Sequence, residues 1–275
     1  MNLACIESQL FVVSKIIGVS VYDFDFNLHF NVQHPIHIDG ENLCVLRVGS
    51  ISNYLNEYSK MLGMGLRLVN SPEEYLLASE LEFWYPLIKE LTPRTQLYDE
   101  LPTVEEVEAN FSWPVFIKGS RQTSKHNIDL SVVQNADQYQ KVIQEYKSNP
   151  ILQWQKAAIR EFVNLQPVDG EIQGKIKPSM EYRSFWWFGK CVGCGCYWSH
   201  LKPYHATDLD AGLKIAQAVA LRVKVPFLVV DFAKTVDDTW IVIECNDGQE
   251  SGNAGVSPIL LWRNILEHIN GIFPL

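Results

Sequence analysis

The chain has 275 residues, of which 47% are hydrophobic and 20% charged, and this composition excludes a disordered, collagen-like or disulfide-scaffold protein. The length allows one large domain or two modest ones. The formal net charge of −9 disfavours binding to nucleic acid or to an anionic membrane through the overall charge of the protein.

The cysteines and the start of the chain indicate a cytoplasmic protein with reduced thiols, because the first residues lack the basic and apolar regions of a secretory signal. Three of the six cysteines lie close together, at Cys191, Cys194 and Cys196. A structural zinc site needs four ligands, and the nearby candidates are His200 and His205. We favour a strand whose small residues pack against a neighbour, with the metal site as the alternative. No apolar stretch approaches the ~20 residues that span a bilayer.

The first part of the chain predicts alternating strands and helices. A β-branched run predicts a strand over residues 15–25, and apolar residues at helical spacing predict a helix from Gly49 to Met64. A short strand is expected over residues 66–69. The alternation predicts a small α/β domain that covers residues 1–105.

The next helix carries the clearest start signal in this part of the sequence. Ser71 is the expected N-cap, Pro72 occupies the first helical position, and Glu74 completes a capping box. A proline inside a helix removes one backbone hydrogen bond, so we expect the helix to break or kink at Pro86.

The second part, residues 106–275, predicts an α+β domain with a mostly antiparallel sheet. The expected strands cover residues 113–118, 128–133, 157–163, 180–189, 191–198, 227–233 and 240–245. The expected helices cover residues 135–146, 211–223 and 258–269. The fourth and fifth of these strands form a hairpin that turns at Gly189 and Lys190.

Two neighbouring strands near the end of the chain carry acidic residues inside apolar runs. Glu244 and Asn246 are two residues apart on one strand, so their side chains share a face, and a hairpin brings Asp231 alongside them. Their oxygens suit Mg²⁺ that also contacts phosphate. The alternative is that both carboxylates simply end strands in water, but an unpaired carboxylate in an apolar run is costly.

A basic segment follows the strand over residues 113–118. Lys118 ends this strand, and the loop over residues 119–127 contains Arg121, Thr123, Ser124, Lys125 and His126. Hydroxyl, amide and cationic groups in such a loop can surround a triphosphate. A solvated loop has the same composition, so both interpretations stay open here.

A third candidate group lies on the strand that begins at Met180. Glu181 and Arg183 share one face of it, where the arginine can bind a carboxylate or phosphate through two hydrogen bonds. An exposed cross-strand ion pair is an equally good interpretation. Arg160 and Glu161 repeat the pattern near the end of another expected strand.

Over about residues 111–260 these segments together resemble the ATP-grasp superfamily, and in particular its clade named for two arginines and a lysine. The residues that carry the resemblance are Lys118, Ile159 to Val163, Glu181, Arg183, Asp231, Glu244 and Asn246. The spacing of the last three is its most specific part. The preceding α/β part resembles the preATP-grasp domain of this superfamily.

The resemblance implies a fold of two α+β lobes that clamp ATP, with Mg²⁺ as second cofactor. The implied catalytic residues are Arg183 and Lys118, and the implied metal ligands are Asp231, Glu244 and Asn246. The implied nucleotide-binding residues are Lys118, Lys125, Arg160, Glu161, Phe162, Val163 and Glu181, with the main chain of residues 161–163 at the adenine. Asp169 and Glu171 are candidates for the acid that binds the ribose. The chain departs from the family in a phosphate loop that is not rich in glycine and in Arg160, which stands near the place of a second lysine.

The implied activity is that of a carboxylate–amine ligase that works through an acyl phosphate. Its substrates would be small-molecule or peptide carboxylates and amines, and a second copy of the chain, in a homodimer, is the other candidate partner. Two alternatives stay open: a small-molecule or peptide kinase with the same site, and a nucleotide-binding module without turnover.

Overall fold

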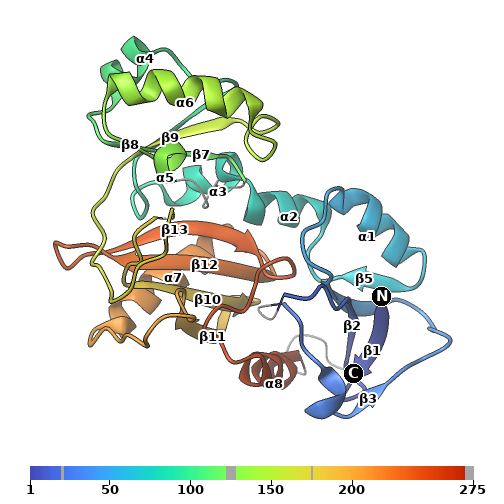
Figure 1. Cartoon of the computed structure of the whole chain (residues 1–275). Helices are drawn as coiled ribbons and strands as arrows, with labels where there is room; N and C mark the ends of the chain where they lie inside the picture. Colours follow the sequence, from blue (N-terminus) through green and yellow to red (C-terminus); the bar gives the residue numbers. More distant parts are fainter. Residues whose placement is uncertain (20–21, 122–127, 175, 270–275) are drawn as a thin grey trace.

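The computed structural model describes residues 1–19, 22–121, 128–174 and 176–269. Its described strands form one five-stranded sheet and two four-stranded sheets. Figure 1 shows the N-terminal sheet at the right, the second sheet near the top, and the third sheet below the second. The arrangement places the last strand of the third sheet, β13, on the side that faces the second sheet (Figure 1).

The N-terminal sheet has the order β3-β1-β2-β4-β5 and mixes antiparallel with parallel pairs. Its strands are β1 (Asn2–Ile6), β2 (Leu10–Ser14), β3 (Val32–Gln33), β4 (Asn42–Arg47) and β5 (Leu66–Leu68). Helix α1 (Tyr54–Leu62) packs on one face through Tyr54 and Met61. The 3₁₀ turn η1 (Phe26–Leu28) contributes Phe26 to the other face. The predicted helix over residues 49–64 therefore forms in its central and C-terminal part.

The strand predicted over residues 15–25 is wrong, because strand β2 ends at Ser14 and the described residues that follow form a loop. The carboxylate of Asp23 accepts hydrogen bonds from the main-chain N–H groups of Ile17 and Gly18, at 2.9 Å each. Gly18 has a φ of +76°, which favours glycine and turns the chain. Local hydrogen bonds of an aspartate thus override the strand propensity of the apolar residues around it.

The capping box at Ser71 is confirmed, with both of its hydrogen bonds, at the start of helix α2 (Pro72–Ser79). The break that follows lies at Glu80 and not at Pro86, which sits inside helix α3 (Leu81–Ile88). A tertiary contact explains the position: Ser120 Oγ donates to the Glu80 carboxylate at 3.0 Å, and the N–H of Leu81 donates to the Ser120 carbonyl.

The second sheet has the order β6-β9-β7-β8, and all its pairs are antiparallel. Its strands are β6 (Thr95–Tyr98), β7 (Val115–Gly119), β8 (Val132–Val133) and β9 (Ala157–Glu161). Helices α4 (Val104–Asn110) and α6 (Ala136–Ser148) pack on it through Val107, Tyr139, Val142 and Tyr146. The helix predicted over residues 135–146 is confirmed as α6, and the side chain of Asn135 caps its start by accepting the N–H of Gln138.

The strand predicted over residues 128–133 is only partly correct. Residues Ile128–Ser131 form the one-turn helix α5, and only Val132 and Val133 pair with β7. The helical turn buries Leu130 in the same core as Val133, so the apolar residues reach the core without a longer strand. A short apolar run does not distinguish these two conformations.

The third sheet has the antiparallel order β11-β10-β12-β13. Its strands are β10 (Glu181–Trp187), β11 (Lys190–Cys196), β12 (Phe227–Lys234) and β13 (Trp240–Asp247). Helix α7 (Leu209–Val223) packs on one face with α3, and helix α8 (Pro258–Ile269) packs on the other with the N-terminal sheet. The predicted hairpin, strands and helices of this region are confirmed.

The cysteine cluster lies on β11, as the strand interpretation predicted. Gly193 and Gly195 alternate with the cysteines, and a Cβ at Gly195 would lie 2.3 Å from the main chain of Gly255. Small residues are thus required because the loop between β13 and α8 packs directly on this strand. Groups of three or more His, Cys, Asp or Glu able to hold a metal are absent among the residues described above.

A boundary near residue 105 stays a prediction, and strand β6 of the part before it pairs with β9 in the second sheet. Within the described ranges, no helix is long and apolar enough to cross a membrane.

Candidate active site

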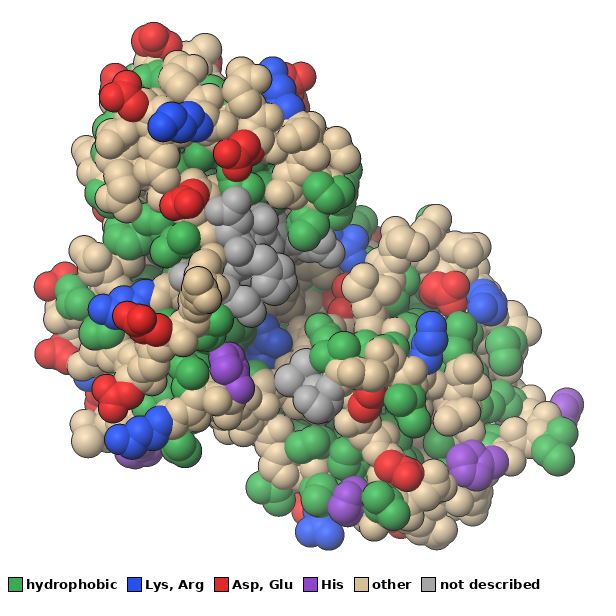
Figure 2. Space-filling view, in the orientation of Figure 1, with side chains coloured by type: hydrophobic (Ala, Val, Ile, Leu, Met, Phe, Trp, Pro, Cys, Tyr) green, Lys and Arg blue, Asp and Glu red, His purple; other side chains and the backbone are tan. Residues whose placement is uncertain are grey.

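A cavity of about 610 Å³ lies between the second and third sheets. One wall comes from β7 and β9, the opposite wall from β10 and β13, and residues 162–165 run between the two sheets along its edge. Figure 2 shows a hollow in this part of the molecule, where the upper lobe meets the parts below it. The described lining is mostly apolar, and a few charged side chains reach into it.

Most of the residues that the sequence singles out line this cavity. They are Lys118, Arg160, Glu161, Phe162, Val163, Glu181 and Glu244. Arg183, Asp231 and Asn246 lie next to these residues on the strands of the third sheet but are not part of the lining. Lys125 lies outside the described residues, as do Thr123, Ser124 and His126.

Lys118 and Glu244 form an ion pair that connects the two sheets across the cavity. Lys118 Nζ donates to Glu244 Oε2 at 2.8 Å, and the two side chains are 3% and 12% exposed. Asn246 Nδ2 donates to the other carboxylate oxygen, Oε1, at 3.0 Å. Both oxygens of Glu244 therefore have a hydrogen-bond donor in a site that is largely shielded from water.

Arg183 and Asp231 form a second buried ion pair, behind the first. They are direct partners in the antiparallel register of β10 and β12, and Asp231 is also the register partner of Glu244 on β13. The guanidinium donates from Nε to Oδ1 at 2.8 Å and from Nη2 to Oδ2 at 2.7 Å, and Nη1 donates to the carbonyl of Gly252 at 2.9 Å. Burial lowers the pKa of Arg183, but the attraction of Asp231 outweighs it and the pKa is raised.

Arg160 lines the cavity, but its hydrogen bonds join structural elements. Its guanidinium donates to Thr92 Oγ1 at 2.7 Å, to Thr95 Oγ1 at 3.1 Å and to the carbonyl of Ile243 at 2.9 Å. Burial lowers the pKa of this arginine to about 10. Since Ile243 belongs to β13, Arg160 holds the second sheet to the third.

The apolar part of the cavity lies beside the end of β9. The chain leaves the sheet at Phe162, and Phe116, Val132, Ile241 and Ile243 complete the wall around it. Residues 161–163 thus line the apolar part of the cavity.

The aromatic segment that follows β11 also reaches the cavity, which the sequence did not indicate. Tyr197, Trp198 and His200 line the cavity, and the Tyr197 ring lies 5.1 Å from the Arg183 guanidinium carbon. Trp198 Nε1 is buried without a hydrogen-bond partner among the described residues. Two adjacent aromatic residues at a strand end were the available signal, but they fell within an expected strand.

The two acids proposed for the ribose do not line the cavity. Asp169 is exposed and forms an ion pair with Lys202 at 3.6 Å. Glu171 is also exposed. The acids that do line the cavity are Glu161, Glu181 and Glu244.

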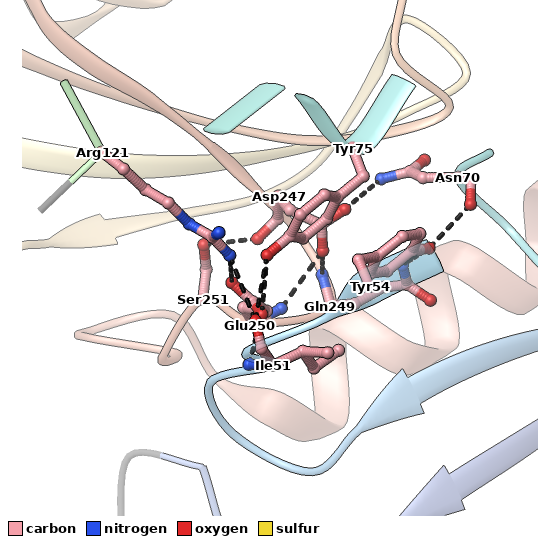
Figure 3. Close-up of polar contacts among 9 residues, drawn as sticks. All are labelled: Ile51, Tyr54, Asn70, Tyr75, Arg121, Asp247, Gln249, Glu250 and Ser251. Atoms are coloured by element: carbon pink, nitrogen blue, oxygen red, sulfur yellow. Dashed lines mark hydrogen bonds and ion pairs between the residues drawn. The ribbon is translucent and has the colours of Figure 1, made fainter. Parts of the chain in front are cut away.

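The loop over residues 247–253 leaves β13 and is enclosed by the N-terminal part of the chain (Figure 3). Asn70 donates to the Asp247 carboxylate at 2.6 Å, and the N–H of Leu46 donates to Gln249 Oε1 at 3.0 Å. The buried Arg47 donates to the carbonyls of Gly248, Gln249 and Ser251 and to Asn253 Oδ1. The same loop supplies the Gly252 carbonyl to Arg183.

Arg121 belongs to the predicted phosphate-binding loop, but its guanidinium contacts Glu250. Nη2 lies 3.2 Å from Glu250 Oε2, while Tyr75 donates to Oε1 at 3.0 Å (Figure 3). The guanidinium also lies over the Tyr75 ring at 4.9 Å. Burial raises the pKa of Glu250 to about 7, and Asp247 adds to this effect while Arg121 opposes it.

The described site has a donor set suited to a hard cation. Glu244 and Asn246 present carboxylate and amide oxygens on one face of β13, and Asp231 lies opposite Glu244. Mg²⁺ takes oxygen ligands and completes its shell with water and phosphate, so a few protein ligands suffice. The residues present therefore fit a magnesium ion shared with a phosphate group.

Residues 106–265, more than half of the chain, match the sequence profile of an ATP-grasp domain, family 3 of the clade named for two arginines and a lysine. Curated protein sequences yield no match.

Solved structures with a similar fold cover most of the chain. An ATP-grasp protein with a RimK domain from Sphaerobacter thermophilus aligns with a TM-score of 0.57 and 11% identity over 82% of this chain and 80% of its own. A D-alanine–D-alanine ligase from Bacillus anthracis, solved with ATP, aligns with a TM-score of 0.57 and 13% identity over 84% of this chain and 78% of its own. A D-Ala:D-Ser ligase from Enterococcus faecalis aligns with a TM-score of 0.56 and 14% identity over 84% of this chain and 72% of its own. At these identities the likeness shows the fold, which is the ATP-grasp fold expected from the sequence.

Proposed function

Because the chain belongs to the ATP-grasp superfamily, in family 3 of the clade named for two arginines and a lysine, we propose that it is an ATP- and Mg²⁺-dependent carboxylate–amine ligase. The observation that supports this most directly is the pairing of Lys118 with Glu244 at the wall of the cavity between the two sheets. A cation for phosphate and an acid for a metal thus face the same space.

We infer the position of the nucleotide from the apolar part of the cavity wall and from the charged part at Lys118 and Glu244. The adenine would lie in the apolar part of the cavity, beside residues 161–163. Main-chain groups of Glu161, Phe162 and Val163 would form hydrogen bonds with the edge of its ring. The phosphates would extend toward Lys118, whose ammonium group can form charge-assisted hydrogen bonds with them. Glu181, on the wall between these regions, would contact the nucleotide, and Lys125 stays a predicted phosphate ligand.

Glu244, Asn246 and Asp231 would hold Mg²⁺, which neutralises negative charge on the phosphates when bound. Both carboxylate oxygens of Asp231 accept hydrogen bonds from the Arg183 guanidinium. To bind the metal as well, one of these oxygens would have to contact Arg183 and Mg²⁺ at the same time. A carboxylate oxygen has two lone pairs, so the two roles are compatible.

Arg183 would stabilise the charge that develops during phosphoryl transfer. In the proposed reaction, the substrate carboxylate attacks the γ-phosphorus and ADP leaves, and an amine then attacks the acyl phosphate and releases inorganic phosphate. Arg183 is held in one orientation by Asp231 and Gly252, which suits a group that stabilises a transition state without reorganising. We propose the same site for the kinase alternative, which lacks the amide step.

An assay for ADP release with pools of carboxylates and amines tests the proposal, with mass spectrometry of the products. An amide product supports the ligase, a phosphorylated product identifies a kinase, and nucleotide binding without ADP release identifies a binding module. The same proposal includes small-molecule or peptide substrates and a cytoplasmic location. It also includes a preATP-grasp domain over residues 1–105. The oligomeric state follows from sedimentation analysis.

A further inference from the structure

The loop over residues 247–253 holds Arg183 through one main-chain carbonyl group. Gly252 is buried, and its carbonyl oxygen accepts a hydrogen bond from Arg183 Nη1 at 2.9 Å. Asp231 accepts from Nε and Nη2 of the same guanidinium. The carboxylate thus fixes one edge of the planar group and the carbonyl fixes the other, so the position of the loop sets the direction in which Arg183 points.

Arg47, on β4 of the N-terminal sheet, holds this loop on both sides of Gly252. Its Nη1 lies 2.6 Å from the carbonyl oxygen of Ser251, and its Nη2 lies 3.3 Å from Asn253 Oδ1. Nη1 also donates to two carbonyl groups earlier in the loop, at 2.9 and 3.0 Å. Burial lowers the pKa of Arg47 to about 10, and the positive charge of Arg183 acts in the same direction, so the two arginines lie near each other.

We propose that Arg47 is a positioning residue for Arg183 and that it acts through the Gly252 carbonyl. The inference rests on the function proposed above, because it gives Arg47 a part in the reaction that Arg183 would assist. Arg47 is not part of the cavity lining that the structure describes, so it would act from outside the cavity.

The physical reason is that stabilisation of a transition state depends on exact placement. A group that stabilises developing charge must already point at it, and a displacement of about 1 Å can lower a rate about 100-fold. Without Arg47, four buried oxygen atoms of the loop lose a donor, and the loop must move to find others. The Gly252 carbonyl then moves with the loop, and Arg183 follows the carbonyl.

The alternative is that Arg47 only connects the N-terminal sheet to the loop. In that case its removal lowers the stability of the protein, and any effect on the rate is independent of Arg183. The two interpretations differ in whether the effects of the two arginines on the rate are coupled.

A double-variant cycle on the rate of ADP release separates the two interpretations. Arg47→Met should lower kcat by about 10- to 100-fold and change the KM for ATP by less than about twofold, because the proposed nucleotide contacts are intact. In a protein that already carries Arg183→Lys, the same substitution should lower kcat by about twofold at most, since the guanidinium that it positions is gone. An unchanged kcat in Arg47→Met, or losses that multiply in the double variant, overturns the proposal.

Two further variants accompany the cycle. Met61→Ala shortens a buried side chain near the C-terminal end of α1, so it destabilises the N-terminal part while Arg47 stays in place, and kcat should stay within about twofold. A loss as large as that of Arg47→Met would assign the effect to destabilisation and overturn the proposal. Arg47→Lys keeps the charge but presents one nitrogen in place of two, and it takes the place of Arg47→Met in the cycle if that variant does not fold, with the same outcomes deciding.

Hydrogen exchange of the Arg183 side chain tests the link without any substrate. The Nε–H group donates to Asp231 Oδ1 at 2.8 Å and is buried, so its proton should exchange slowly with solvent. In Arg47→Met we expect nuclear magnetic resonance to show exchange that is about tenfold faster at this signal, which is identified by its loss in Arg183→Lys. An unchanged exchange rate overturns the proposal.

The two measurements also separate this inference from the proposed function. If the unmodified protein releases no ADP with any pool of substrates, the proposed function fails, and the exchange measurement still decides whether Arg47 positions Arg183. If the unmodified protein releases ADP but the losses multiply, only the role of Arg47 fails.

Discussion

At the scale of single residues, the site depends on arginines with different duties. Arg160 joins Thr92, Thr95 and the carbonyl of Ile243, so its contacts are structural. Arg183 holds Asp231 through two parallel hydrogen bonds and lies beside the cavity wall. A planar guanidinium makes both arrangements possible, and an ammonium group cannot reproduce either.

Arg183→Lys should lower the rate of ADP release by about 100-fold or more, because a lysine keeps the charge but loses the fixed two-bond geometry with Asp231. Steady-state kinetics with the substrates found in the pool assay measures this effect. The matched control is Arg222→Lys, since Arg222 forms an exposed pair with Glu90 on the surface. Equal rates in the two variants would exclude the proposed role of Arg183.

At the scale of elements, the loop over residues 247–253 has a pH-dependent stability that follows from Glu250. Burial and, to a smaller extent, the nearby negative charge of Asp247 raise its pKa from the ordinary value of 4.5 to about 7. Between these two pH values the folded protein keeps a proton that the unfolded chain has lost. The contribution of Glu250 to stability is therefore present at low pH and is lost as the pH rises through this range.

The Glu250→Gln variant has no group that titrates at this position. It therefore does not lose this contribution to stability as the pH rises. The free energy of unfolding of the variant, relative to the unmodified protein, should therefore rise by about 2–3 kcal/mol between pH 4.5 and 7.5. Urea denaturation at a series of pH values gives this difference. A difference that is constant over the series would show that the pKa of Glu250 is the same in the folded protein and in the unfolded chain.

Elements with local signals could be predicted from the sequence, and elements set by tertiary contacts could not. The capping box of α2 is complete within four residues, so Ser71 identified it. The break at Glu80 depends on Ser120, which lies far away in the sequence, and no local pattern contains that contact. The loop that Asp23 forms with Ile17 is local, but the apolar residues around it favoured a strand, so the sequence pattern pointed to the wrong conformation.

The same distinction holds for the candidate site. Lys118 and Glu244 stand out because a charged residue within an apolar run needs a partner, and the structure pairs them. Their direct contact joins two sheets, which the sequence does not reveal. Trp198 gave no charge signal, so its place in the cavity wall appears only in the structure.

At the scale of the whole molecule, the second and third sheets are connected by buried polar contacts across the cavity. Lys118 and Glu244 form one connection, and Arg160 with the carbonyl of Ile243 forms another. Buried ion pairs are costly to break on one side, although their replacement by a neutral pair is often nearly neutral. The stability of the lobe arrangement therefore depends on whether both partners are present.

Lys118→Met should lower the free energy of unfolding by about 3 kcal/mol, because it removes the cation that binds the shielded Glu244 carboxylate at 2.8 Å. The double variant Lys118→Met with Glu244→Gln should recover most of this loss. Chemical denaturation of the single and double variants measures the coupling. If the two losses simply add, the ion pair contributes nothing to the connection between the sheets.

Arg47 shows how the N-terminal part of the chain is tied to the rest. It belongs to β4, yet it donates to the carbonyls of Gly248, Gln249 and Ser251, more than 200 residues later in the sequence. In terms of recombination, the two parts cannot be exchanged freely between relatives, because a new N-terminal part without this arginine would leave buried carbonyl groups without donors. The first and last parts of the gene are therefore expected to be inherited as a matched pair.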